Sequence, residues 1–175
     1  KKWVTISSEK IRARREAFEK EYAKHKLQKS ANNAATKGVL NNIVIFISFA
    51  DDTTFSKSFT EVYNDYMDSS SSSAVSVYNY YRTVSYCQFY LKSSFYPLQN
   101  DTIIVSYKDM YPRAYYSPYD SITNPNGYTS SNKTSREHLL LYRAVEAVKS
   151  QIPSSIEIDS DGDGRVDNVS FILNG

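Results

Sequence analysis

The clearest pattern of hydrophobic positions lies between residues 42 and 49. This stretch reads NIVIFISF, a nearly unbroken apolar and β-branched run that is too short for a helix. Two carboxylates, Asp51 and Asp52, follow it directly. Such a run is typical of a strand buried on both faces of a sheet, and helices must then cover that sheet. The pattern therefore predicts a central strand in a layered α/β structure.

The next two segments have the periodicity of covering helices. Five residues recur at helical spacing and predict a core-facing helix: Phe55, Phe59, Val62, Tyr63 and Tyr66. A serine-rich loop ends this stripe. Residues 74–84 then predict a second helix.

Two strands are expected after these helices. Residues 88–97 and 102–110 both alternate apolar and polar positions, and in the second stretch Ile103 and Tyr107 share one face while Ile104 points the opposite way. A proline and a Gln-Asn-Asp sequence separate the two stretches, which suits a turn. The spacing therefore predicts an antiparallel pair.

The last third of the chain predicts a long loop, a helix and a strand. Residues 111–133 hold three prolines and an Asn-Gly turn signal, which indicates an irregular surface excursion. Ser135 is then expected to cap a helix over residues 136–152. Its predicted inward residues are Leu139, Leu140, Tyr142, Ala144, Val145 and Val148. Residues 168–175 alternate as a final strand.

The organisation is one domain with an appendage, because 175 residues of which 41% are hydrophobic suffice for one substantial core. Residues 1–30 predict a basic helical arm with a thin apolar stripe, residues 31–38 a linker, and residues 39–175 the folded body. The expected fold class is α/β (α+β), a mixed and mostly buried sheet with packed helices.

Charge and composition exclude few partners. Residues 1–30 carry ten Lys or Arg against four Glu, a net charge of +6, while the remainder carries −4. A basic helix with few aromatic residues is better explained as a solvated helix that leans on the acidic body than as a nucleic-acid grip, so no nucleic acid is expected. No run of about 18 apolar residues occurs, so no membrane span is expected. The single cysteine, Cys87, has aromatic neighbours typical of a small buried hydrophobe.

The most specific motif is the acidic stretch of residues 159–167, DSDGDGRVD. Counted from its first residue, Gly164 occupies position 6 and the backbone carbonyl of Arg165 falls at position 7. Side-chain oxygens occupy positions 1, 3, 5 and 9, contributed by Asp159, Asp161, Asp163 and Asp167. This is the ligand spacing of an EF-hand-type calcium loop, in which alternate residues point at one ion and glycine permits a sharp turn. The sequence therefore predicts a calcium site.

The predicted site departs from a calcium sensor. Position 12 is Ser170 instead of the bidentate glutamate of an EF-hand, and the following element is expected to be a strand. A loop between a helix and a strand lacks the helix pair that a sensor opens. The calcium is therefore expected to be structural, and the alternative is a solvated acidic turn without an ion.

Catalytic chemistry is sparse in these residues. The chain holds two histidines, His25 and His138, and no His-Glu-x-x-His sequence. His138 is interpreted as a helix-surface residue rather than a metal ligand. There is neither a Gly-x-Ser-x-Gly nucleophile turn nor a glycine-rich phosphate loop.

Three motifs in order resemble the front part of the catalytic domain of the M6 (immune inhibitor A-like) family of secreted bacterial zinc metallopeptidases. The matching residues are Phe49-Ala50-Asp51, then Ser76-Val77, Tyr80-Tyr81 and Ser85-Tyr86, then Asp159, residues 161–164 and residues 166–168. The resemblance covers roughly residues 39–175. Cys87 stands where the family usually has glycine.

The resemblance implies a zincin-like upper subdomain, with residues 1–30 as the end of a pro-segment or a linker from one. In the family a His-Glu-x-x-His helix that binds Zn²⁺ lies further along the chain, and these 175 residues do not contain one. The implied function is part of a secreted or cell-surface, calcium-stabilised zinc endopeptidase that is inactive by itself. Its implied partners are a protein or peptide substrate and the C-terminal half of the catalytic domain.

Two other functions remain open on the sequence. A noncatalytic calcium-stabilised module derived from the same fold would hold a protein or a glycan through its tyrosine-rich surface or the loop of residues 111–133. A calcium-sensing regulator is disfavoured by the missing glutamate at position 12 of the loop and by the single site.

Overall fold

The computed structural model describes residues 38–71, 73–100, 102–160 and 162–174. Its elements in chain order are strand β1 (Gly38–Ser48), helices α2 (Phe59–Met67) and α3 (Val77–Val84), strands β2 (Phe89–Tyr96) and β3 (Tyr107–Lys108), the 3-10 helix η1 (Arg113–Tyr116), helix α4 (Lys133–Val148), the 3-10 helix η2 (Lys149–Gln151) and strand β4 (Val169–Leu173). The arm helix and nearly all of the linker predicted before Gly38 lie outside the described residues.

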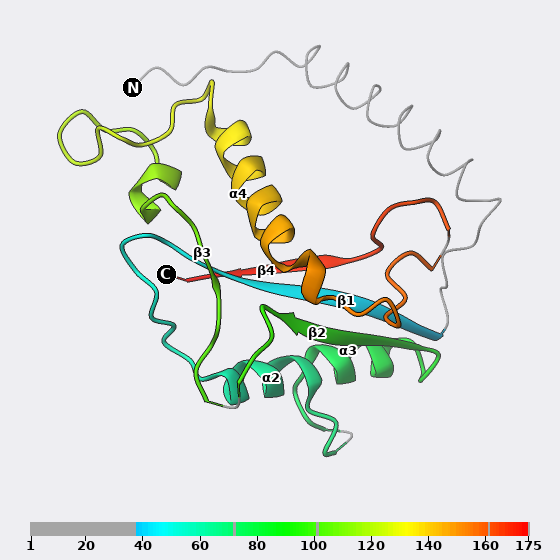
Figure 1. Cartoon of the computed structure of the whole chain (residues 1–175). Coiled ribbons are helices and arrows are strands. Elements are labelled where there is room, and N and C mark those ends of the chain that lie inside the picture. Colours follow the sequence, from blue (N-terminus) through cyan, green and yellow to red (C-terminus); the bar gives the residue numbers. More distant parts are fainter. Residues whose placement is uncertain (1–37, 72, 101, 161, 175) are drawn as a thin grey trace, which may run out of the picture.

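Strand β1 is the centre of the sheet, and each of the three strands paired with it runs parallel to it. Residues 43–45 pair with both β2 and β4, so those two strands lie on opposite edges of β1. Ile47 pairs with both Tyr107 and Leu173, which puts β3 on the same edge as β2, further along β1. Parallel neighbours require crossover connections, and the helices supply them (Figure 1).

The predicted antiparallel pair of residues 88–97 and 102–110 is wrong. Both segments pair with β1, so the described strands form a parallel rather than a mixed sheet. The Gln99 side chain shows why: its Nε2 donates to the Val105 carbonyl at 2.7 Å and its Oε1 accepts from the Val105 amide at 2.9 Å. These bonds join Gln99 to Val105, so the chain turns aside after β2 instead of pairing back onto it.

The two faces of β1 supply two separate hydrophobic clusters. Its odd-numbered residues pack with α4, in a cluster that includes Ile43, Ile45, Ile47, Leu140, Ala144 and Val148. Its even-numbered residues pack with α2 and β2, in a cluster of Val44, Phe46, Val62, Phe95 and Ile104. Every residue from 42 to 49 is buried, which confirms the predicted central strand. Figure 1 shows α4 on one side of the sheet and α2 with α3 on the other.

Serine caps set the beginnings of α2 and α3. The Ser58 hydroxyl accepts from the Glu61 amide at 3.3 Å, and Glu61 Oε2 accepts from the Ser58 amide at 2.8 Å, a capping box. Phe55, predicted as the first helical position, precedes α2 but still contacts Phe46 edge to face, with ring centroids 5.6 Å apart. In α3 the Ser76 hydroxyl accepts from the first-turn amide of residue 79 at 3.1 Å.

Helix α4 begins earlier than predicted and buries a narrower stripe. Asn132 is its N-cap residue, and the Ser135 hydroxyl donates to the Asn132 carbonyl at 2.9 Å instead of capping the helix. Leu140, Ala144 and Val148, one turn apart, are buried as predicted. Leu139 and Tyr142 are 54% and 62% exposed, because α4 lies against the sheet along a single row of residues.

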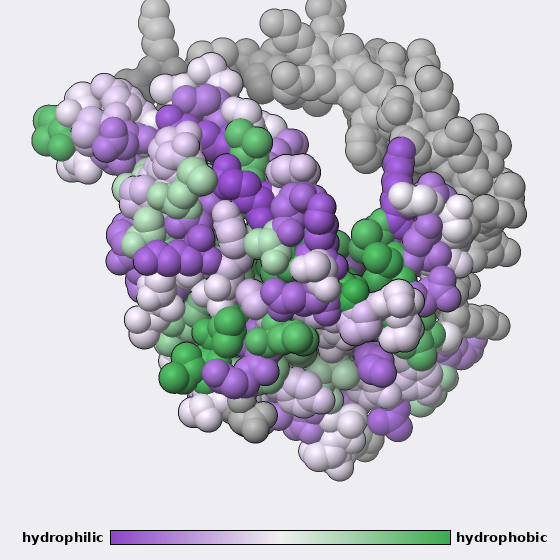
Figure 2. All heavy atoms as spheres, viewed as in Figure 1, coloured by the Kyte–Doolittle hydropathy of each residue, from purple (hydrophilic) through white to green (hydrophobic). Residues whose placement is uncertain are grey.

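The surface carries its hydrophobic side chains in small separate groups among hydrophilic ones on the face shown in Figure 2. Tyr86 and Ile122 are among the most exposed, at 87% and 89%. Within the described part of the chain, no helix combines the length and the apolar character needed to cross a membrane.

Candidate calcium site

The acidic loop of residues 159–167 leads from the end of η2 to strand β4, and it lies at the end of the sheet where β1 begins (Figure 1). At its base the Asp167 amide donates to the Ile158 carbonyl at 2.8 Å. This bond brings the two ends of the loop together.

Asp159 is the residue around which the loop turns. Its Oδ1 accepts from the Asp163 amide at 3.0 Å and its Oδ2 accepts from the Gly164 amide at 2.8 Å. The carboxylate at position 1 therefore faces the backbone of positions 5 and 6. An alternate-residue calcium loop requires this winding, because the chain must curl back over its first ligand.

Two other predicted ligands are held by bonds to nearby groups. Asp163 Oδ1 accepts from the Arg165 amide at 2.9 Å. Asp167 Oδ2 accepts from both the amide and the hydroxyl of Ser160, at 2.7 and 2.6 Å. The carboxylate at position 9 is thus joined to position 2, so both ends of the loop are fixed from within it.

Two glycines make the turn possible. Gly162 and Gly164 have φ values of +66° and +79°, in the left-handed region that residues with a Cβ rarely adopt. Open space surrounds the place where a Cβ would stand at either position. Backbone conformation, and not crowding, therefore requires glycine here.

The donor chemistry of the loop fits Ca²⁺, which prefers carboxylate and carbonyl oxygens. The structure places Asp159, Asp163 and Asp167 on one loop, while Asp161 lies outside the described residues. Among the residues that are described, no three His, Cys, Asp or Glu side chains gather into a group that could hold a metal ion. The complete ligand set, with the Arg165 carbonyl, stays a prediction.

A second polar cluster, which the sequence analysis did not single out, centres on Asp109 just after β3. This residue is 1% exposed. Its Oδ1 accepts from Arg143 Nε at 2.9 Å, and its Oδ2 accepts from the Tyr116 hydroxyl at 2.6 Å. Arg143 also donates to the Tyr116 hydroxyl at 2.7 Å, so the three side chains form a closed triangle. An arginine on the inward face of a predicted helix was the signal that could have revealed a buried acid.

Burial and hydrogen bonding oppose each other at this cluster. Burial raises the pKa of the Asp109 carboxyl, but the hydrogen bonds from Tyr116, Arg143 and the Tyr111 amide outweigh it and hold that pKa below its usual range. Burial, followed by the bond to Asp109, raises the pKa of Tyr116. Asp109 is therefore an anion and Tyr116 a neutral donor at neutral pH.

The cluster holds residues 111–133, the segment after β3, against helix α4. Arg136, one helical turn from the start of α4, donates to the carbonyls of Tyr115 and Asn126 at 2.8 and 2.9 Å. Its guanidinium lies 3.7 Å from the centre of the Tyr115 ring. The segment predicted to be irregular is thus anchored by two arginines of the same helix. The chemistry of this cluster is that of a structural anchor.

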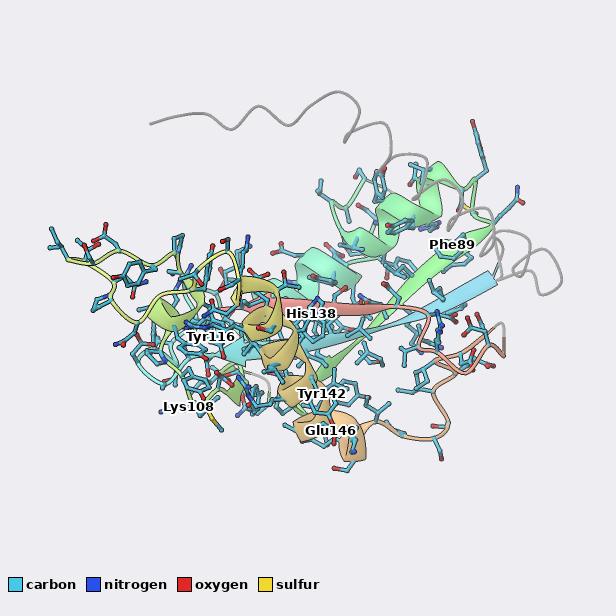
Figure 3. The ribbon with its side chains drawn as sticks, turned by 90° about the horizontal axis from the view of Figure 1, so that it is seen from above. Phe89, Lys108, Tyr116, His138, Tyr142 and Glu146 are labelled. Atoms are coloured by element: carbon cyan, nitrogen blue, oxygen red, sulfur yellow. The ribbon has the colours of Figure 1, made fainter. Side chains whose placement is uncertain are left out.

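The predicted surface position of His138 is confirmed, whereas the buried position of Cys87 is wrong. His138, Tyr142 and Glu146 follow one another along the exposed side of α4 (Figure 3). Cys87 is exposed, because it lies in the turn between α3 and β2 with φ at +60°. Among the described residues the donor set for a zinc ion is therefore missing, and the chain's other histidine, His25, lies outside them.

Comparison with protein-family models found no match, and comparisons with curated proteins and with solved structures found none either. The fold defines a parallel α/β sheet covered by helices on both faces. The resemblance to the M6 peptidases stays a prediction that rests on the motifs.

Proposed function

We propose that residues 39–175 form the calcium-stabilised, zincin-like upper subdomain of a secreted zinc endopeptidase of the M6 type. The support is the order of three motifs along the chain together with the loop that contains the third one. The proposal assigns this chain a structural role within the parent enzyme. Hydrolysis is expected to need a His-Glu-x-x-His helix, which these 175 residues do not contain.

The observation that carries the proposal is the geometry around Asp159. Its two carboxylate oxygens accept from the backbone amides of positions 5 and 6 of the loop, at 3.0 and 2.8 Å. A glycine with positive φ stands at position 6, where a calcium loop makes its sharp turn. This arrangement, together with the ligand spacing of the sequence, favours a calcium loop over a solvated acidic turn.

The backbone of the turn before β2 also supports the family resemblance. Cys87 has φ at +60°, a conformation that glycine adopts at little cost. The M6 family usually has glycine at this position. The backbone here therefore keeps the conformation that the family's residue type favours, although the side chain differs.

Calcium binding is tested by isothermal titration of metal-free protein with CaCl₂, with MgCl₂ as the matched titration. We expect one site that prefers Ca²⁺, because Mg²⁺ demands tighter octahedral geometry. Absence of heat and of thermal stabilisation at millimolar Ca²⁺ would contradict the calcium assignment.

The peptidase assignment is tested on the gene. Its sequence beyond the codon for Gly175 should encode a His-Glu-x-x-His helix within several tens of residues. The polypeptide that includes this helix should contain zinc and hydrolyse casein, and a zinc chelator should abolish the hydrolysis. A longer polypeptide that holds no zinc and leaves casein intact would reject the assignment.

A noncatalytic calcium-stabilised module is the second candidate function. The observation that favours it is the exposure of tyrosines, which stack on sugars and peptides: Tyr86 is 87% exposed and Tyr80 62%. Binding of a glycan or peptide by residues 39–175 alone, weakened by Tyr86→Ala, would support this function over the peptidase.

A further inference from the structure

The two ends of the acidic loop are attached to residues 41 and 43 of the central strand. On one side, Asn41 Nδ2 donates to the Glu157 carbonyl at 2.8 Å, two residues before the loop begins. On the other side, the Ile43 amide donates to the Asn168 carbonyl at 3.2 Å, one residue after it ends. Residues 41 and 43 thus hold the loop's two ends at a separation that the rigid strand dictates.

Asn42, between them, binds the far end of the loop through its side chain. Its Oδ1 accepts from Asn168 Nδ2 at 3.1 Å and from the Ser170 hydroxyl at 3.0 Å. Its Nδ2 donates to the Ser93 hydroxyl of β2 at 3.1 Å. The amide of Asn42 therefore links β1 to β2 on one side and to β4 on the other.

Burial makes the hydrogen bonds of the Asn42 side chain costly to lose. Asn42 is 1% exposed, in a strand whose other buried positions are almost all apolar. A buried amide without its hydrogen-bond partners destabilises the fold, so the partners of Asn42 are constrained to stay in place. An apolar residue would serve a mere packing role equally well.

We infer that Asn41 and Asn42 are positioning residues for the calcium loop, which fix the separation and orientation of its two ends before an ion binds. Ordering a loop in advance removes a part of the entropic cost of binding. Groups that hold metal ligands in place affect metal affinity although they never contact the ion. This inference rests on the proposed calcium site.

The test compares Asn42→Ala with Asn79→Ala by calorimetric titration with CaCl₂. Asn79 is a matched control, because it is also buried, at 3% exposure, and its amide donates to the Ser71 and Ala74 carbonyls in the loop between α2 and α3. We expect both variants to lose stability. Asn42→Ala should also lose about tenfold in calcium affinity. Equal calcium affinity in the two variants would overturn the inference.

Two single variants outside the buried core give a second readout if Asn42→Ala proves too unstable to purify. Asn41→Ala and Asn168→Ala remove partners at the two ends of the loop while they leave the buried amide in place. Each should weaken calcium binding severalfold, because each removes a side-chain hydrogen bond that holds one end of the loop. Unchanged affinity in both single variants would overturn the inference.

A wrong calcium site and a wrong positioning role give different experimental results. If the unaltered chain binds no Ca²⁺, the proposed site is wrong. The positioning role is then decided by hydrogen exchange at the amides of Asp163 and Gly164, which donate to the Asp159 carboxylate. Faster exchange in Asn42→Ala than in Asn79→Ala supports the role, and equal exchange rejects it.

Discussion

The carboxylate of Asp109 and the guanidinium of Arg143 form an ion pair at 2.8 Å in which the acid side chain has no exposed surface. Asp109 follows the short strand β3, and Arg143 comes from the middle of α4. The pair therefore joins one edge of the sheet to the helix that covers it. It also fixes the point where the chain leaves the sheet for the excursion towards α4.

Removal of the cation should destabilise the fold. Arg143→Met keeps much of the side-chain length but leaves Asp109 buried without its positive partner, so we expect a loss of about 3 kcal/mol in the free energy of unfolding. The measurement is urea denaturation followed by circular dichroism. Lys57→Met is the control, because Lys57 pairs with Asp65 at 2.6 Å on the surface and should cost less than about 1 kcal/mol. Similar losses for both variants would contradict the prediction.

Acidification should remove the contribution of Asp109 to the free energy of unfolding. Its folded pKa lies below the ordinary 3.8, so its ionised form stabilises the fold at every pH above 3.8, and this stabilisation disappears as the pH falls through the folded value. The stability difference between the unaltered chain and Asp109→Asn should thus be constant from pH 5 to 7 and shrink below pH 4. Urea midpoints across this range check it. A difference that grows on acidification would show the opposite sign of the pKa shift.

Calcium should raise the melting temperature. At a Ca²⁺ concentration a hundred times the Kd, binding adds about 2.7 kcal/mol, which corresponds to a rise of about 5 to 10 °C for a chain of this size. Differential scanning calorimetry with CaCl₂ and with EGTA measures it. Asp159→Asn should abolish the rise. Asp120→Asn should retain it, because Asp120 accepts from the amides of Ile122 and Thr123 in a different loop. Equal effects of the two variants would place the ion elsewhere.

Glycine at position 87 should stabilise the turn before β2. Cys87 has φ at +60°, where a residue with a Cβ is strained by roughly 1 to 2 kcal/mol. We expect Cys87→Gly to gain about 1 kcal/mol, because part of the relieved strain is offset by the greater entropy of an unfolded glycine. Cys87→Ser is the control, since it removes the thiol and keeps the strain. A gain in the serine variant equal to that in the glycine variant would attribute the effect to the sulfur.

Local patterns predicted the elements of the body well. The apolar run of residues 42–49 is the buried central strand, and the helical stripes became α2 and α4. The acidic loop was found from ligand spacing alone, since its chemistry depends on residues that are adjacent in the chain. The resemblance to the M6 family also comes from short local motifs.

Relationships between distant residues were missed. The turn signals around Pro97 show that the chain leaves a strand, but they do not say where it returns, so β3 was paired with β2 instead of with β1. The ion pair of Asp109 with Arg143 joins residues 34 positions apart, and the bond of Asn42 with Asn168 joins residues 126 positions apart. In both pairs, the sequence around one residue does not indicate which distant residue is its partner.

The amino-acid sequence by itself determined the secondary-structure segments, the buried central strand and the carboxylate loop, because these depend on periodicity, capping and spacing within a few residues. The tertiary structure alone decided the parallel order of the strands, the exposure of Leu139 and Cys87, and the attachment of the loop to Asn41 and Asn42. Strand pairing and burial are properties of the whole packed chain. Strand pairing and burial minimise unpaired backbone groups and exposed apolar area over all elements at once. The sequence of a single segment therefore does not determine them.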